Sequence, residues 1–231
     1  MTNYKYYYNN VPKHGLCRNN LIYTSLISED KKTFVQWYYN DSDYHKGMNE
    51  VVDPNLMDMK FNREVKYLTL MGKEYPDHVP AFEINEVERK IFLEVQGNDF
   101  WEQSGCLEEN YSNVLPNWQE QMIEIFQAHK SLGLYKYSLH PSSYFIVNGK
   151  LKSFNYFFTY QDGEGPLTVR EHLSHISEGR RQEMKPKTDA MGIDWDEPQT
   201  LHTMQMLTFE SFRNNYPSDF IERARNVFST N

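Results

Sequence analysis

The sequence predicts a two-lobed α+β fold, with a β-rich N-terminal lobe over residues 1–96 and a mainly helical C-terminal lobe over residues 97–231. Runs of β-branched and aromatic residues separated by polar turns dominate the first part, whereas apolar residues recur at helical spacing in the second. An Asn-Gly dipeptide at positions 148 and 149 marks a hairpin over residues 144–154, embedded among the helices. Strands followed by helices are typical of α+β domains, and the two parts join near residues 95–100.

Two hairpins are expected in the first part. LIYTSLISED (21–30) and KKTFVQWYY (31–39) are β-rich runs that meet at a polar turn. HVPAFEIN (78–85) and RKIFLEV (89–95) form the second pair of strands. The N-terminal segment YKYYYNN (4–10) is interpreted as an exposed arm or edge strand, in preference to a surface on which nucleic-acid bases stack.

A helix is expected between these two hairpins. Asp53 can cap its N-terminus, Pro54 suits the first helical position, and Gly72 can end it. The apolar residues that recur at helical spacing between these signals are Phe61, Val65 and Leu68.

The second part carries its own helix signals. Asn117 and Glu120 predict an N-cap pair, and Gly133 predicts the end of that helix. Its apolar face consists of Trp118, Met122, Ile125, Phe126 and Leu132. Further helices are expected from the Thr168-x-x-Glu171 pattern onward, over about 199–213 and over about 218–228.

Composition limits the classes of function. The formal net charge of −8 disfavours nucleic-acid binding, which normally uses a basic stripe. No run of about 18 apolar residues exists, so no membrane-spanning helix is expected. The two cysteines, Cys17 and Cys106, are too few for a disulfide framework, and the N-terminus lacks the order of charged and apolar residues of a signal peptide. These features predict a soluble, cytoplasmic protein.

Three stretches resemble parts of the protein-kinase-like fold. FNREVKYL (61–68) is similar to the regulatory helix of the small lobe, with Glu64 at the position of its ion-pairing glutamate. KIFLEVQGNDFWE (90–102) is similar to the fifth strand and the hinge. YSLHPSSYFIVNGKLKSFNYF (137–157) is similar to the catalytic loop, its hairpin and the metal-binding motif. The resemblance covers roughly residues 20–160 and implies one kinase-like domain with a reduced C-terminal lobe.

The resemblance places neutral residues at the functional positions of that fold. The catalytic aspartate falls on Ser138, the catalytic-loop asparagine on Ser143, and the aspartate of the metal-binding motif on Asn155. The lysine that holds phosphates falls on Gln36, or on Trp37 if the alignment shifts by one residue. The turn SEDKK of the first hairpin has no glycine-rich loop.

This substitution pattern has a chemical consequence that does not depend on the alignment. Phosphoryl transfer needs carboxylates that hold Mg²⁺ and orient the attacking hydroxyl group. No Asp or Glu occurs between Glu124 and Asp162, so neither the loop nor its hairpin supplies an anionic oxygen. Asn155 offers only an amide oxygen, and Ser138 has no neighbouring base.

The function expected from these residues is therefore that of a pseudokinase, a kinase-like protein without catalysis that binds a protein partner or a ligand between its lobes. The backbone of the predicted hinge, at Glu94, Val95 and Gln96, offers hydrogen-bond groups to a nucleotide base. Nucleotide binding without a metal ion is therefore also considered. One alternative is an unconventional phosphoryl or nucleotidyl transferase that takes its carboxylates from Glu64, Asp99 or Asp162. Another is a structural or assembly protein that reuses the fold.

Other polar signals are weaker. His172 and His175 stand three positions apart, a spacing compatible with a metal ligand pair, but no further ligand residues surround them in the expected pattern. Cys106 has no supporting signature of a nucleophile, and the acidic segment 189–198 is expected to be a solvated turn because it lacks the full spacing of a calcium loop. No metal site is predicted.

Overall fold

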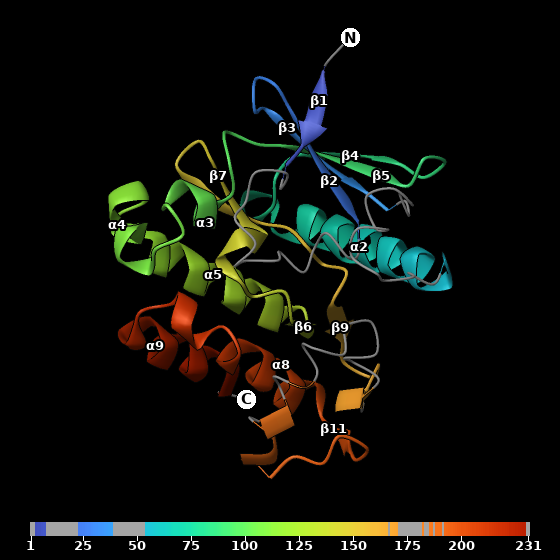
Figure 1. Cartoon of the computed structure of the whole chain (residues 1–231), viewed down its shortest axis with the longest axis vertical. Coiled ribbons are helices and arrows are strands. Elements are labelled where there is room, and N and C mark those ends of the chain that lie inside the picture. The colour runs from blue at the N-terminus through green and yellow to red at the C-terminus, as the bar shows by residue number, and fades with distance from the viewer. Residues whose placement is uncertain are drawn as a thin grey trace.

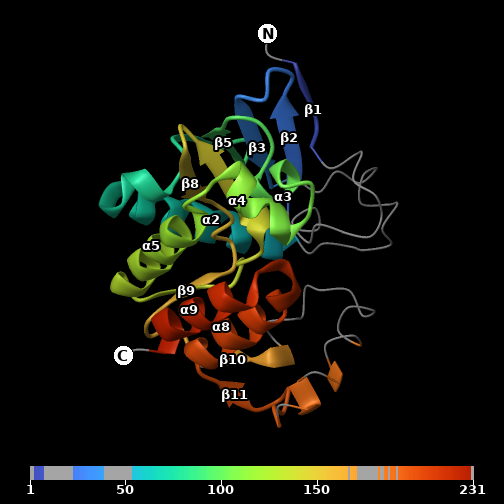
Figure 2. The ribbon, with the colours of Figure 1, turned by 90° about the vertical axis from the view of Figure 1, so that its left-hand side faces the viewer.

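The computed structural model describes residues 3–7, 23–38, 54–165, 167–170, 182, 185–186, 188–190 and 192–229. The β-rich part lies at one end of the long axis, with α2 (Pro54–Glu74) beside it (Figure 1). α5 (Trp118–Ser131) lies in the middle, and α8 (Leu201–Glu210) and α9 (Ser218–Ser229) lie toward the other end, as the side view also shows (Figure 2). This arrangement confirms the predicted α+β class.

A five-stranded antiparallel sheet forms the β-rich end. Its strands are β1 (Tyr4–Tyr6), β2 (Thr24–Ser28), β3 (Thr33–Trp37), β4 (Phe82–Asn85) and β5 (Lys90–Glu94). They are ordered β1-β2-β3-β5-β4, so β1 is an edge strand. Both predicted hairpins are confirmed, as is the expectation of an edge strand near the N-terminus, at residues 4–6.

Helix α2 begins its described range at Pro54, as predicted, but it does not end at Gly72. It continues to Glu74. A Cβ atom at Gly72 would lie 2.8 Å from the Phe82 ring, so the glycine allows β4 to pack closely against the helix. The predicted stop signal is thus a packing feature inside the helix, and the predicted cap, Asp53, lies outside the described residues.

The part after residue 97 contains short helices before the long one. They are α3 (Phe100–Gln103) and α4 (Tyr111–Val114), with 3₁₀ turns at Pro76–His78, Glu108–Asn110, Pro141–Ser143 and Arg213–Asn215. Helix α5 buries the predicted apolar face through Trp118, Met122, Ile125 and Phe126. The Asn117 side chain does not cap α5, because its Oδ1 accepts a hydrogen bond from Gln121 Nε2 at 2.9 Å instead.

Three two-stranded pairings accompany these helices. β7 (Tyr144–Val147) and β8 (Lys150–Ser153) form the predicted hairpin, whose turn residues Asn148 and Gly149 have φ values of 53° and 71°. β6 (Leu134–Lys136) pairs with β9 (Thr159–Gln161), and β10 (Leu167–Thr168) pairs with β11 (Pro198–Gln199). These last four strands were not predicted, because strands of two or three residues leave no readable alternation in the sequence.

The last two helices match the predicted ones within a few residues. α8 is shorter than the expected 199–213 because Thr200 caps it, its side chain accepting a hydrogen bond from Thr203 N at 3.1 Å. The Thr168-x-x-Glu171 signal is only partly described: Thr168 ends β10, and Glu171 lies outside the described residues. In the described part of the chain, no helix is long and apolar enough to cross a membrane.

The hydrophobic core is continuous across the junction near residues 95–100. One cluster of buried residues contains Tyr23 and Phe34 from the sheet region together with Phe145 and Phe154 from the later hairpin. A second cluster joins α5, α8 and α9 around Trp118. The first cluster therefore packs the β-rich part against the segment that carries most of the predicted site residues.

Candidate functional site

Asn155 lies at the centre of a buried polar cluster between the sheet and the segment that follows β8. Its Oδ1 atom accepts hydrogen bonds from the Tyr23 hydroxyl at 2.5 Å and from Gln36 Nε2 at 3.0 Å. Its Nδ2 donates to Ser143 Oγ at 3.1 Å. All four side chains are buried. The structure therefore brings together three predicted site residues, Gln36, Ser143 and Asn155, and adds Tyr23.

The backbone at Asn155 turns the chain at the end of the hairpin. β8 ends at Ser153, and Phe154 N still donates to the Ser143 carbonyl at 3.1 Å. Asn155 then adopts a φ of 65°, in the left-handed region that asparagine tolerates better than most residues. This conformation is one reason why a short polar residue occupies the position.

Glu64 projects from α2 into the same buried region. Its Oε2 atom accepts a hydrogen bond from Phe157 N at 2.7 Å and one from the Tyr38 hydroxyl at 3.4 Å. The side chain is fully buried, and burial raises its pKa to about 7, with nearby Lys136 acting in the opposite direction. Glu64 thus joins α2 to the segment after Asn155.

Lys136, on β6, is the cation that faces Glu64. It is fully buried, and its Nζ donates to the Ser138 carbonyl and lies 5.4 Å from the ring centroids of both Tyr144 and Tyr156. Burial lowers its pKa to about 7, while the Glu64 charge acts to raise it. The sequence resemblance placed this cation on β3, where Gln36 stands instead. Ser138 contributes its carbonyl oxygen to the lysine rather than a hydroxyl to the Asn155 cluster.

Aromatic rings fill the space between β3 and the β7–β8 hairpin. The Phe34 ring centroid lies 5.2 Å from that of Phe145 and 5.4 Å from that of Phe154. Phe145 and Phe154 stack at 4.7 Å, and Tyr7 meets Phe34 edge-on at 5.2 Å. The three phenylalanines are fully buried, so this part of the region between the sheet and the hairpin is packed with side chains.

The predicted hinge residues form part of the sheet and its edge. Glu94 N donates to the Ala81 carbonyl at 2.8 Å, and Val95 N donates to the Lys32 carbonyl at 2.9 Å. The Gln96 side chain bonds to the turn of the β7–β8 hairpin. The backbone donors of Glu94 and Val95 are therefore already used inside the protein.

The carboxylates considered for an unconventional transferase are also engaged away from Asn155. Asp99 accepts hydrogen bonds from the Tyr7 hydroxyl and from Glu102 N, each at 3.0 Å. Asp162 hydrogen-bonds to Tyr135, whose pKa it helps to raise. Together with Glu64, these three carboxylates lie on three different elements and do not converge on one reacting centre.

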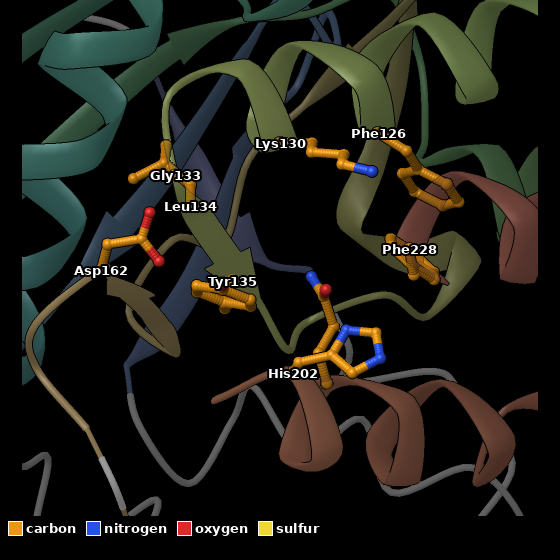
Figure 3. Close-up of a pocket in the computed structure, with 9 residues that line it drawn as sticks. Phe126, Lys130, Gly133, Leu134, Tyr135, Asp162, His202 and Phe228 are labelled. Atoms are coloured by element: carbon orange, nitrogen blue, oxygen red, sulfur yellow. The ribbon is translucent and has the colours of Figure 1, made fainter. Parts of the chain in front are cut away.

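A cavity of about 240 Å³ lies on another side of the protein, among α5, β6, α8 and α9 (Figure 3). The rings of Phe126 and Phe228 line one side of it, and Asp162 lies at the opposite side beside Gly133. The Lys130 amine at this cavity donates to the Val227 carbonyl at 2.9 Å. Of the residues predicted to form a site, only Asp162 lines it, so the cavity is distinct from the Asn155 cluster.

The described residues contain no group of three or more His, Cys, Asp or Glu side chains that could hold a metal ion. His172 and His175 lie outside the described residues. No family model matches the chain, and no curated protein matches it either. The function of the Asn155 cluster is therefore inferred from its own geometry.

Three residues that complete this cluster were not predicted from the sequence. Tyr23, Tyr38 and Lys136 all contact predicted site residues, yet none belongs to a recognisable motif. No readable strand signal marks Lys136, because β6 is only three residues long; Lys136 and Leu134 stand two positions apart on it and so share one face. Both are buried.

Proposed function

We propose that this protein is a cytoplasmic, catalytically inactive protein of kinase-like fold, and that it acts by binding a protein partner. The observation that carries the proposal is the hydrogen-bonded network of neutral side chains around Asn155. Both Tyr23 and Gln36 donate to the Asn155 amide oxygen, so the atom best placed to approach a cation already accepts two hydrogen bonds. Phosphoryl transfer needs anionic oxygens at such a position.

The arrangement of elements supports the kinase-like part of the proposal. A five-stranded antiparallel sheet holds α2 in the sequence between β3 and β4, and Glu64 of that helix reaches the segment after the β7–β8 hairpin. The resemblance assigned Gln36, Ser143 and Asn155 to one site, and both Gln36 and Ser143 hydrogen-bond to Asn155. A chance alignment would not be expected to bring together residues so distant in sequence.

Two features favour a protein partner over a nucleotide. The rings of Phe34, Phe145 and Phe154 pack together beside the predicted hinge, where a base would otherwise insert. The backbone N–H groups of Glu94 and Val95 donate to carbonyl groups of the protein. A nucleotide would have to displace these rings, at the cost of contacts worth about 1 kcal/mol per aromatic pair beyond their burial.

Thermal unfolding of the full chain tests this proposal. The chain is heated alone and with ATP, ADP or inorganic triphosphate, each with and without Mg²⁺ or Mn²⁺ at matched ionic strength. We expect no metal-dependent rise in the unfolding temperature. A ligand present at about 100 times its Kd raises the unfolding temperature of a chain of this size by roughly 5–10 °C. If the unfolding temperature rose by this amount with a nucleotide and a metal ion, but not with triphosphate and the metal ion, the proposal that the protein is catalytically inactive would be overturned.

A further inference from the structure

The N-terminal strand docks one tyrosine into a built site at the edge of the sheet. The Tyr7 hydroxyl donates to Asp99 Oδ2 at 3.0 Å and accepts from Asp99 N at 2.6 Å. The Tyr7 ring meets Phe34 edge-on, with 5.2 Å between centroids. A carboxylate, a backbone donor and an aromatic wall together recognise a phenol, because each part of the side chain finds its own partner.

Asp99 is held in place independently of Tyr7. Its side chain caps α3 by accepting a hydrogen bond from Glu102 N at 3.0 Å, and its backbone forms a bridge with Phe145. It is fully buried, as are Phe34 and Phe145. The receptor for the tyrosine is therefore part of the folded core, whereas the tyrosine itself comes from an edge strand.

The strand that precedes Tyr7 is short. β1 pairs with β2 over only three residue pairs, Tyr4 with Ser28 through Tyr6 with Leu26. Main-chain hydrogen bonds from Tyr7 N to the Ser25 carbonyl and from Glu29 N to the Asn3 carbonyl flank this pairing. Residues 7–23 separate the two strands, so the pairing is not that of a tight hairpin. Short edge strands of this kind open at a small fraction of the global unfolding free energy.

We propose that the edge of β2 that pairs with β1, the Phe34 ring and Asp99 form a peptide-binding site that residues 3–7 occupy in the chain by itself. The partner is a protein that presents an extended segment with a tyrosine, which replaces β1 by adding a strand to the sheet. The occupant's chemistry is defined by β1 itself: main-chain pairing gives affinity, and the phenol that reaches Asp99 gives specificity. This inference rests on the proposed partner-binding function.

A fluorescent peptide of residues 1–10, MTNYKYYYNN, tests the site on the full chain. Anisotropy measures its binding to the wild-type chain, to Tyr7→Ala and Tyr7→Phe, and to Tyr4→Ala as a control. Tyr4 lies on β1, three positions before Tyr7, and is 40% exposed. Circular dichroism and thermal unfolding establish that each variant is folded, and Tyr7→Phe retains the ring if Tyr7→Ala is damaged.

The intact β1 competes as a tethered ligand with an effective concentration in the millimolar range, so the Tyr7 variants should bind the peptide at least about 10-fold more tightly than the wild type. Tyr4→Ala should behave like the wild type, and a peptide with Tyr7→Phe should bind at least about 5-fold more weakly, since it loses both bonds to Asp99.

Equal binding of the two peptides, or no binding by folded Tyr7 variants, would overturn the site. A wild-type dimer that Tyr7→Phe abolishes would overturn the assignment to a foreign partner and identify a second copy instead. None of these outcomes alters the nucleotide measurements, which use no peptide. A negative result in the peptide experiment can therefore be told apart from a negative result for the proposed function.

Discussion

Gln36 Nε2 and Asn155 Oδ1 lie 3.0 Å apart, although 119 positions separate the two residues in the sequence. The bond ties β3 to the segment after β8, and both residues are fully buried. Because neither is charged, the contact avoids the desolvation cost of a buried ion. The two residues therefore join β3 to the segment after β8 through a hydrogen bond between uncharged groups.

The substitution Asn155→Asp should lower the stability of the protein. Aspartate tolerates the φ of 65° and can accept the bonds from Tyr23 and Gln36, so the variant differs mainly by a buried charge. We expect a loss of about 2–3 kcal/mol in the free energy of unfolding at pH 7.5, measured with urea.

A double variant, Gln36→Lys with Asn155→Asp, provides the matched control. It supplies a cation beside the new carboxylate and should recover part of the loss, because a paired buried charge costs less than an unpaired one. If Asn155→Asp were as stable as the wild type, the surroundings of Asn155 would have to be far more polar than the contacts described above.

Phe34→Ala tests the aromatic packing between the sheet and the hairpin. The ring contacts Phe145, Phe154 and Tyr7, so its removal leaves a cavity with several unpartnered walls. We expect the free energy of unfolding to fall by about 3–5 kcal/mol in chemical denaturation. Phe92→Ala on the adjacent strand β5 is the control: Phe92 is only partly buried, and its loss should cost clearly less. Equal losses of unfolding free energy in the two variants would indicate that the Phe34 ring packs no better than the partly buried Phe92 ring.

The sequence predicted much of the fold because its signals were local. Asn148-Gly149 adopts the positive φ values that its hairpin needs, and α5 buries the predicted apolar face. Gly72 shows the limit of such signals, since a glycine that permits a close approach by Phe82 looks the same in sequence as one that ends a helix. The short pairings of β6 with β9 and of β10 with β11 depend on tertiary contacts that no short window of sequence contains.

The candidate site was predictable only in part. The order of motifs placed Gln36, Ser143 and Asn155 together, and they are hydrogen-bonded as one network. Lys136 could not be assigned to Glu64 by that route, because the cation comes from β6 rather than from β3. The contact of Tyr7 with Asp99 spans 92 positions and follows from strand pairing at the sheet edge, which sequence periodicity does not specify.

Lys136→Met should reveal the electrostatic coupling to Glu64. The raised pKa of Glu64, about 7, means that the folded chain binds more protons there than the unfolded chain between about pH 4.5 and 7. The contribution of this carboxyl to stability therefore falls as the pH rises through that window. Without Lys136, whose own pKa of about 7 leaves it charged only at lower pH, the pKa of Glu64 rises further. From pH 5.5 to 7 the variant should therefore lose about 1 kcal/mol more stability than the wild type loses.

The partner variants complete this test. Glu64→Gln alone and the double variant Glu64→Gln with Lys136→Met close a double-mutant cycle, measured by urea unfolding at pH 7. We expect a coupling free energy of about 1–3 kcal/mol, because each single change strands the other residue in the core. Additive losses would show that the two side chains do not act on each other.

Asp99→Asn should change how stability depends on pH. Burial, the largest cause, raises the pKa of Asp99 to about 7 from an ordinary value of 3.8. The contribution of Asp99 to stability is fully present below the ordinary value and is lost as the pH rises through about 7. Asparagine keeps a cap for α3 and an acceptor for Tyr7 but carries no charge. The variant should therefore gain about 2 kcal/mol in the free energy of unfolding over the wild type at pH 8, with the gain shrinking toward pH 4.5.

Tyr7→Phe is the control, because it leaves the Asp99 carboxyl in place. Below pH 6 its stability should depend on pH as that of the wild type does. A gain for Asp99→Asn that is constant from pH 4.5 to 8 would contradict the raised pKa and with it the buried, water-excluded setting of the Tyr7 site.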